Sequence, residues 1–368
     1  MKKLNVAVIY GGVSPEHMIS RSSANTIISN LSSEKCNIIP IYINKEGTWL
    51  AYDNYGSNLK NFKWEQIGVP VTLSVDHLQK GLFRIMRDKA KLVAVDVIFP
   101  VLHGLNGEDG NIQGLFEIAG IPYVGCNVAA SAICADKSFM RAIAKNISLP
   151  QTSYLVFTLT DYQKDKEKIL EAIENKLGYP CFIKPCNGGS SIGMTKAKDK
   201  KEVEEGFDLA FNYDKKIIVE KAVVGREFEC SVLEDDNFGQ VRVSCVGEIK
   251  QESEFYTYDA KYMDKTSYTV IPADLPKRIS QKIRDYSLKM FEAVNGNGLS
   301  RIDFFVEDGT NKVIFNEINT MPGFTSISMY PKLWEQEGVK LENLLDILIE
   351  SAFKKSSGGG RKIWSIEQ

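Results

Sequence analysis

The sequence of 368 residues is long enough for two or three domains, and its 43% hydrophobic and 25% charged residues are ordinary for a globular enzyme. A formal net charge of −2 provides no bulk field that would attract nucleic acid or an anionic membrane surface. No apolar run reaches the roughly 18 residues needed to span a bilayer, so the sequence argues against a membrane protein.

Strands and helices alternate through the first third of the chain. The pattern predicts strands at 6–10, 38–43, 94–101 and 123–125, and helices at 16–30 and 110–119. The run at 94–101 is apolar apart from Asp96, which favours a strand buried on both faces of a parallel sheet. This order favours an α/β fold with an open, doubly wound parallel sheet.

The rest of the chain mixes strands and helices in a less regular order. We expect strands at 154–157, 181–184, 217–220, 227–233, 300–306 and 313–316, with helices at 129–145, 161–177, 199–212, 277–294 and 341–352. Such a pattern predicts two α+β lobes after the first domain. Gly and Ser residues near 356–360 predict a flexible tail.

The cysteines and histidines indicate the cellular compartment and restrict which metals the protein could bind. The seven cysteines are dispersed and form no Cys-x-x-Cys pair, which is typical of a protein in a reducing cytoplasm. Only three histidines are present, and no Cys/His cluster has the spacing of zinc ligands. Any metal is therefore expected to be Mg²⁺ on carboxylates.

A Gly-rich segment suits phosphate binding. Lys184 ends a predicted strand, and the loop Gly188–Gly193 follows with the hydroxyls of Ser190 and Ser191. Glycines let consecutive backbone N–H groups approach an anion closely. A plain turn is the alternative, and the sequence contains neither a P-loop nor a G-x-G-x-x-G pattern.

Two adjacent predicted strands carry a cation and three oxygen ligands. Arg301 and Asp303 alternate on one strand, and Glu317 and Asn319 alternate on the next, so each pair shares a face. If the strands pair, this face could hold Mg²⁺ against nucleotide phosphates, with Arg301 stabilising a transferring phosphoryl group. A cross-strand salt bridge on a solvated face is the alternative, although the Gly/Pro loop 320–326 would add N–H groups beside the metal.

These residues together resemble the ATP-grasp superfamily and, within it, the D-alanine–D-alanine ligase family. The similarity runs from about residue 6 to about residue 350. It is carried, in order, by the motif at 101–110 (VLHGLNGEDG), the loop at 188–193, the segment FYTYDAKY at 255–262 and the motif NEINTMPG at 316–323. The resemblance implies a Rossmann-like N-terminal domain at 1–128, followed by a two-lobed α+β ATP-grasp fold. Its central lobe would be 129–234 and its C-terminal lobe, with the catalytic and metal residues, 235–354; a flexible tail would follow at 355–368.

The resemblance also implies roles for individual residues. For ATP it implies phosphate contacts from Lys137, Lys184 and Ser191, and adenosine contacts from Glu220, Lys221, Val223 and Glu227. It implies two Mg²⁺ ions, with Mn²⁺ as an alternative, on Asp303, Glu317 and Asn319, and an oxyanion site from Arg301 and the amide of Gly323. His103 would hold the carboxylate of the first substrate and Ser328 that of the second, with Ser190 and Tyr262 near the first. Tyr262 and Lys261 would belong to a lid that closes over the site.

One departure from the family pattern concerns the first substrate. After the Gly-Gly turn the family has an acidic residue before a Val/Ile-Ser pair, and the aligned position here is Met18. Glu16 lies two residues earlier, about 200° around an ideal helix, so it is not expected to reach the same spot. Either Glu16, after a change in the backbone, or another acid replaces the missing carboxylate, or the first substrate differs.

The resemblance implies an ATP-dependent ligase that makes a D-alanyl dipeptide through an acyl-phosphate, for cell-wall peptidoglycan. The tyrosine-rich segment at 255–262 favours an amide product, and D-serine stays open as second substrate. A ligase for other D-amino acids and a non-catalytic nucleotide-binding protein are the alternatives. A homodimer that assembles through the N-terminal domain is also implied, with small-molecule D-amino acids as the other partners.

Overall fold

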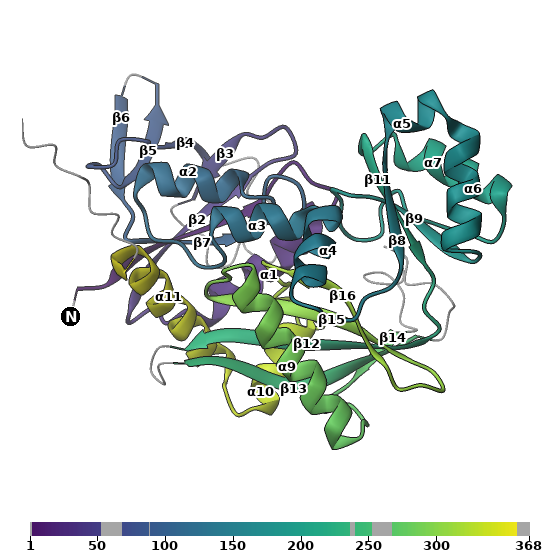
Figure 1. The fold of residues 1–368 in the computed structure, drawn as a ribbon. Coiled ribbons are helices and arrows are strands. Elements are labelled where there is room, and N and C mark those ends of the chain that lie inside the picture. The colour runs from purple at the N-terminus through teal and green to yellow at the C-terminus, as the bar shows by residue number, and fades with distance from the viewer. Residues whose placement is uncertain (1, 53–67, 88, 236–239, 252–266, 359–368) are drawn as a thin grey trace, which may run out of the picture.

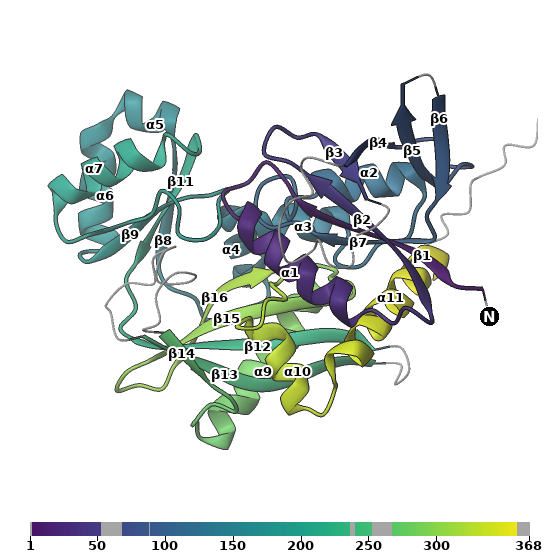
Figure 2. The same ribbon diagram turned by 180° about the vertical axis from the view of Figure 1, so that it is seen from behind.

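The structure is a computed structural model that describes residues 2–52, 68–87, 89–235, 240–251 and 267–358. Within these residues, three sheets follow one another along the chain, and helices cover their faces (Figure 1). The second sheet and its helices project to one side of the other two in both views (Figures 1 and 2). No helix within the described residues is long and apolar enough to cross a membrane.

The first sheet has seven strands in the order β6-β5-β4-β3-β2-β1-β7. Its strands are β1 (Leu4–Gly11), β2 (Cys36–Ile43), β3 (Trp49–Ala51), β4 (Val69–Leu73), β5 (Gly81–Met86), β6 (Lys89–Ala94) and β7 (Val97–Val101). Only β1 with β2 and β1 with β7 pair in parallel, and the other neighbours are antiparallel. The expectation of a wholly parallel sheet was therefore wrong beyond these three strands, because the chain turns back as successive antiparallel strands from β2 to β6.

Strand β1, which lies between β2 and the edge strand β7, is buried on both faces. Val6 and Val8 pack with the helices α1 (His17–Asn30) and α11 (Leu341–Gly358). Ala7 and Ile9 pack on the opposite face with α2 (Asn111–Ala119). Because β1 and β7 are parallel neighbours, their carboxyl ends lie side by side. Ligands commonly bind at this edge of such sheets.

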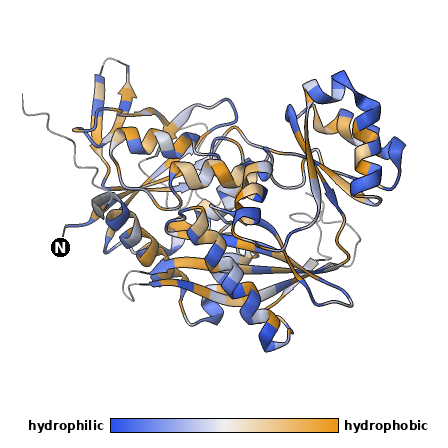
Figure 3. Cartoon of the chain, in the orientation of Figure 1, coloured by the Kyte–Doolittle hydropathy of each residue, from blue (hydrophilic) through white to orange (hydrophobic). Residues whose placement is uncertain are grey.

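The second sheet has four antiparallel strands in the order β10-β9-β11-β8. Its strands are β8 (Tyr154–Thr158), β9 (Cys181–Pro185), β10 (Thr195–Ala197) and β11 (Lys216–Lys221). The helices α5 (Leu159–Lys164), α6 (Lys166–Lys176) and α7 (Lys200–Ala210) share its apolar core. Blue, hydrophilic residues line much of the outward side of these helices in Figure 3.

The third sheet has five antiparallel strands in the order β14-β13-β12-β15-β16. They are β12 (Gly225–Asp235), β13 (Gln240–Gln251), β14 (Ser267–Val270), β15 (Leu299–Glu307) and β16 (Val313–Asn319). One face packs in a core shared with α3 (Val128–Ala135), α4 (Lys137–Asn146) and α9 (Lys277–Ala293). The helices α10 (Met329–Gln336) and α11 contact the sheet outside that core.

Several details differ from the elements expected from the sequence. The predicted helix at 161–177 is two helices, α5 and α6, because the carboxylate of Asp165 accepts from the N–H of Lys168 and begins α6. The predicted helix at 129–145 is two helices, because the carboxylate of Asp136 accepts from the N–H groups of Ser138 and Phe139 and begins α4. The chain enters the third sheet at Gly225, ten residues before the predicted lobe boundary at 234/235, which stays a prediction. Finally, α11 continues to Gly358, through the first part of the predicted tail.

Candidate active site

The polar face of the third sheet carries the predicted metal ligands. Strand β15 pairs with β16 so that Arg301 lies opposite Asn319 and Asp303 opposite Glu317. This confirms the pairing that the alternation of the two strands predicted. The register of this pairing shifts between Asp303 and Phe304. Because of this irregularity, Phe315 of β16 is buried in the core while Glu317 of the same strand stays opposite Asp303.

Arg301 is surrounded by carboxylates. Its guanidinium donates to both oxygens of Asp303 at 2.7 and 2.8 Å, and its Nε lies 3.0 Å from Oε2 of Glu229. Burial opposes the charge, but Asp303 and Glu229 outweigh it and raise the pKa of Arg301 well above its usual range. The arginine is therefore a permanent cation at this place.

The oxygen ligands on this face fit a hard cation. Asp303 also accepts a hydrogen bond from Asn319 Nδ2 at 3.1 Å, so the carboxylate and the amide lie side by side. Carboxylate and amide oxygens are the ligands that Mg²⁺ takes in proteins. Within the described part of the chain no group of three or more His, Cys, Asp and Glu side chains is placed to hold a metal ion. The predicted set has only two carboxylates and one amide, so phosphate oxygens of a nucleotide would have to complete the coordination.

A cavity of about 780 Å³ lies between the second and third sheets. Its walls include these residues with predicted roles: Lys137, Lys184, Ser190, Ser191, Glu220, Lys221, Val223, Glu227 and Glu317. The sequence placed them at four separate stretches of the chain, and the fold brings all of them to one cavity. A volume of this size is in the usual range for a small-molecule or cofactor site.

A buried charge cluster lies at one wall of this cavity. Glu220 is buried, and its two oxygens accept from Arg141 Nε and Lys184 Nζ, each at 2.7 Å. Burial alone would raise the pKa of Glu220, but Arg141 and Lys184 lower it to about 2. Glu220 thus fixes the ammonium group of Lys184 in the cavity wall.

This cluster makes stability depend on pH. Between about pH 4.5 and pH 2 the unfolded chain protonates Glu220 while the folded protein keeps it ionised, so its contribution to the free energy of unfolding declines as the pH falls. We expect Glu220→Gln to destabilise the protein at pH 7, and the gap to the wild type to narrow steadily below pH 4.5. Urea unfolding at several pH values measures this, with the exposed Glu171→Gln as control. A gap that stays constant down to pH 2.5 would contradict the assigned ionisation.

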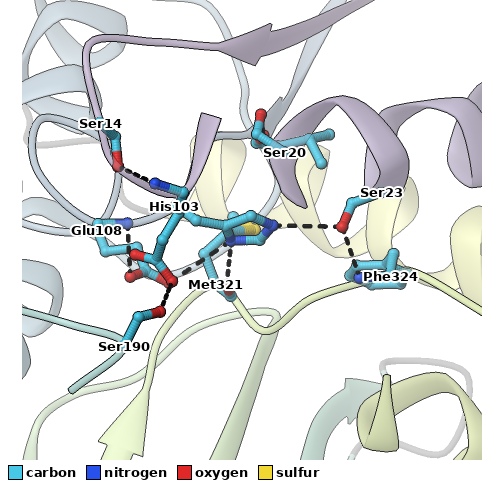
Figure 4. Close-up of polar contacts among 12 residues, drawn as sticks. Ser14, Ser20, Ser23, His103, Glu108, Ser190, Met321 and Phe324 are labelled. Carbon is cyan, nitrogen blue, oxygen red and sulfur yellow. Dashed lines mark hydrogen bonds and ion pairs between the residues drawn. The ribbon is translucent and has the colours of Figure 1, made fainter. Parts of the chain in front are cut away.

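A second polar cluster gathers where the N-terminal sheet meets the Gly-rich loop. Glu16 directly precedes α1, and its side chain is mostly buried. Its carboxylate accepts a hydrogen bond from the hydroxyl of Ser190 (Figure 4). A Cβ added at Gly104 would come within 2.6 Å of Glu16 Oε2, and one at Gly189 within 3.2 Å. The two glycines therefore leave room for the carboxylate.

Met18 has different surroundings. Its side chain is 49% exposed, and its Sδ lies 3.5 Å from Nη1 of Arg21. On an ideal helix Glu16 lies about 200° from Met18, so it was not expected to reach the same spot. Glu16 nevertheless contacts Ser190 and lies against Gly189, whereas Met18 is half exposed. Of the two alternatives stated for the missing acid, the geometry favours a carboxylate supplied by Glu16.

His103 follows β7 and faces the same cluster. Its Nδ1 lies 3.2 Å from the carbonyl of Met321, and its Nε2 lies 3.4 Å from Ser23 Oγ. Burial would lower the pKa of His103, but Glu108, 3.9 Å away, and Glu16 outweigh it and raise the pKa. His103 is thus held between the N-terminal sheet and the loop that follows β16, as Figure 4 shows.

Gly323 and Ser328 lie beside each other in the loop between β16 and α10. A Cβ added at Gly323 would come within 2.8 Å of Ser328 Oγ, so only glycine fits without displacing the serine. Ser328 Oγ also accepts from the N–H of Thr325 at 3.0 Å. The predicted catalytic residues Lys261 and Tyr262 lie outside the described residues.

Two residues of the site were missed in the sequence, and a third was argued against. Arg141 and Glu229 are buried charges whose partners come from other strands, so no local pattern marks them. Glu16 was present in the motif but was set aside on helix geometry. Such residues are recognised because a charged side chain is buried, and burial is known only once the fold is known.

Models of two family domains match the chain. The model described as "D-ala D-ala ligase N-terminus" matches residues 5–126, and the one described as "D-ala D-ala ligase C-terminus" matches residues 143–350. The chain belongs to the D-alanine–D-alanine ligase family.

Full-length relatives in this family are close in sequence. The D-alanine–D-alanine ligase of Caldicellulosiruptor bescii is 47% identical over 97% of this chain and 97% of its own length. The corresponding protein of Acetivibrio thermocellus is 46% identical over 96% of both. As a member of the D-alanine–D-alanine ligase family, the chain is an ATP-dependent ligase.

Solved structures of the family share the fold. The VanG D-Ala:D-Ser ligase from Enterococcus faecalis superposes with a TM-score of 0.86 at 36% identity, covering 95% of this chain and all of that one. The D-alanine–D-alanine ligase from Coxiella burnetii gives a TM-score of 0.85 at 32% identity, over 97% and 96% of the two chains. The fold is thus the ATP-grasp fold of the D-alanine–D-alanine ligase family, as expected from the sequence.

Proposed function

We propose that this chain joins two molecules of D-alanine for peptidoglycan precursor synthesis. The observation that carries the proposal is the contact between Glu16 and Ser190, which puts a buried carboxylate beside the nucleotide cavity. A carboxylate there accepts the ammonium of an amino acid, while the same substrate's carboxylate is directed toward the ATP phosphates. Glu16 replaces Met18 in our assignment of the first-substrate site.

The chemistry follows from the weakness of a carboxylate as an electrophile. One oxygen of the first substrate's carboxylate attacks the γ-phosphorus, which releases ADP and forms an acyl-phosphate. The amine of the second D-alanine then attacks the carbonyl carbon, the C–O bond to phosphate breaks, and inorganic phosphate leaves as the amine loses a proton. Arg301 and the N–H of Gly323 are assigned to the tetrahedral oxyanion.

The nucleotide is assigned to the cavity between the two sheets. Lys137 and Lys184 bind its phosphates, and the chain from Glu220 to Glu227 binds adenosine. Asp303, Glu317 and Asn319 are assigned to Mg²⁺, or Mn²⁺ in its place, which when bound neutralises the charge of the transferring phosphate. Tyr262 and Lys261 are assigned to the closing lid.

The second substrate is assigned to the loop around Ser328. Its hydroxyl lies beside Gly323, so a carboxylate held there would place the attacking amine near the oxyanion site. D-Serine is the main alternative second substrate, since a solved relative at 36% identity is a D-Ala:D-Ser ligase. We also assign the protein to the cytoplasm and propose that it forms a homodimer.

A substrate panel tests this function. Release of phosphate from ATP and Mg²⁺ is measured with D-alanine alone, then with D-alanine plus D-serine or D-lactate. We expect D-alanine alone to support turnover and to give the dipeptide as the main product in every mixture. A mixed D-alanyl-D-serine product in large excess would reassign the second substrate, and phosphate release without any coupled product would contradict a ligase.

A further inference from the structure

The loop between β16 and α10 carries the predicted oxyanion donor, the N–H of Gly323. Residues 320–328 form no strand or helix, so no ladder of backbone hydrogen bonds fixes the direction of this N–H group. A donor of this kind works only if it is held in place before the charge develops. Side chains from elsewhere must therefore position the loop.

Two hydrogen bonds from the N-terminal domain hold the loop on either side of Gly323. The N–H of Phe324 donates to Ser23 Oγ at 3.1 Å, and the carbonyl of Met321 lies 3.2 Å from His103 Nδ1. Ser23 and His103 also contact each other at 3.4 Å. Figure 4 shows the four residues in one chain of contacts between α1 and the loop.

Ser23 lies at the centre of this arrangement. It is fully buried, and its Oγ is 4.0 Å from the Cβ position of Gly323. One turn earlier on α1, Ser20 accepts from the N–H of Gly11 and donates to the carbonyl of Val101, which ties the helix to β1 and β7. The helix is thus fixed to the N-terminal sheet by Ser20 and to the catalytic loop by Ser23.

We propose that Ser23 is a positioning residue that sets the direction of the Gly323 N–H through its hydrogen bond with Phe324. The inference rests on the proposed function of the Gly323 site. Without the hydroxyl, the buried N–H of Phe324 loses its acceptor, and the Gly323–Phe324 peptide group turns to find another. Gly323 has no Cβ to resist this rotation, so the neighbouring Pro322–Gly323 peptide, which carries the Gly323 N–H, is displaced with it. The N–H that stabilises the tetrahedral oxyanion then moves, while the ATP cavity is unchanged.

The test separates the two chemical steps. Rapid quenching with labelled ATP measures cleavage of ATP in the first turnover, and dipeptide is measured in the same samples. In Ser23→Ala we expect a burst in which about one ATP is cleaved per active site, at close to the wild-type rate. The dipeptide should then form roughly ten- to a hundredfold more slowly than in the wild type. The Kd for ATP, measured in the absence of D-alanine, should not change.

Control variants separate positioning from loss of structure. Ser287→Ala removes another fully buried helix hydroxyl, one that donates to Ile283 in α9, and should behave as wild type. Ser23→Thr keeps the hydroxyl and should restore most of the rate. If Ser23→Ala does not fold, Ser23→Cys keeps a side chain of similar shape with a much weaker acceptor and should show the same burst.

Three results overturn the inference. They are a kcat of Ser23→Ala within twofold of Ser287→Ala, a parallel loss of ATP cleavage and dipeptide formation without a burst, and a failure of Ser23→Thr to recover any activity in a folded protein. A wild type that forms no dipeptide from ATP and D-alanine refutes the proposed function itself, and the inference with it.

Discussion

Replacing Glu317 by Gln is expected to lower turnover by several orders of magnitude and to leave the fold intact. Glu317 lies opposite Asp303 across β15 and β16 and also lines the nucleotide cavity. Its charge is therefore placed beside both the other proposed metal ligands and the ATP phosphates. Gln keeps the size of the side chain and removes the charge that a bridging ligand supplies. Each tenfold loss corresponds to about 1.4 kcal/mol of lost transition-state stabilisation.

Turnover of this variant is measured as ADP release at saturating ATP, Mg²⁺ and D-alanine. Glu307→Gln, at the opposite end of β15 from Arg301, serves as the matched control and should retain normal activity. Circular dichroism and thermal unfolding confirm that both variants are folded. A Glu317→Gln enzyme with kcat within tenfold of the wild type would show that the ion is held elsewhere.

Replacing Glu16 by Gln is expected to raise the KM for the first D-alanine by roughly ten- to a hundredfold. The carboxylate is mostly buried beside Ser190, so a substrate ammonium there makes a charge-assisted hydrogen bond, for which the usual contribution is about 1.5–3 kcal/mol. Gln keeps the contact with Ser190 but not the charge. Initial rates over a wide range of D-alanine concentrations give the two KM values.

Met18 provides the opposing control for that experiment. Its side chain is half exposed and contacts Arg21, so Met18→Glu should leave the first KM unchanged. If Met18→Glu instead tightens first-site binding and Glu16→Gln has no effect, the alignment that placed Met18 at the acidic position was right and the structural assignment of Glu16 is wrong.

Short-range patterns in the sequence predicted the parts of the site that depend on strand geometry. The period of two in β15 and β16 is enough to place Arg301 and Asp303 on one face, and the turn between the strands brings Glu317 opposite Asp303. The loop at 188–193 was likewise identified from its glycines. Each of these features is decided within about twenty residues of chain.

The parts that could not be predicted depend on distant partners. Glu16 was argued against from the geometry of one helix, but its contact with Ser190 joins residues 174 positions apart in the sequence. Ser23 reads as an ordinary helix residue, since its partners, His103 and Phe324, lie about 80 and 300 residues away. The antiparallel half of the first sheet was missed because short strands beside a parallel core have no distinct pattern.

Transfer of oxygen from D-alanine to phosphate tests the central claim most directly. D-Alanine labelled with ¹⁸O in both carboxylate oxygens is incubated with the enzyme, ATP and Mg²⁺, and phosphate and dipeptide are analysed by mass spectrometry. If the first carboxylate is activated as an acyl-phosphate, each phosphate released carries one ¹⁸O, and the new amide keeps the other. Phosphate without label, formed together with ADP, would mean that water attacks ATP and that the chain does not ligate by this route.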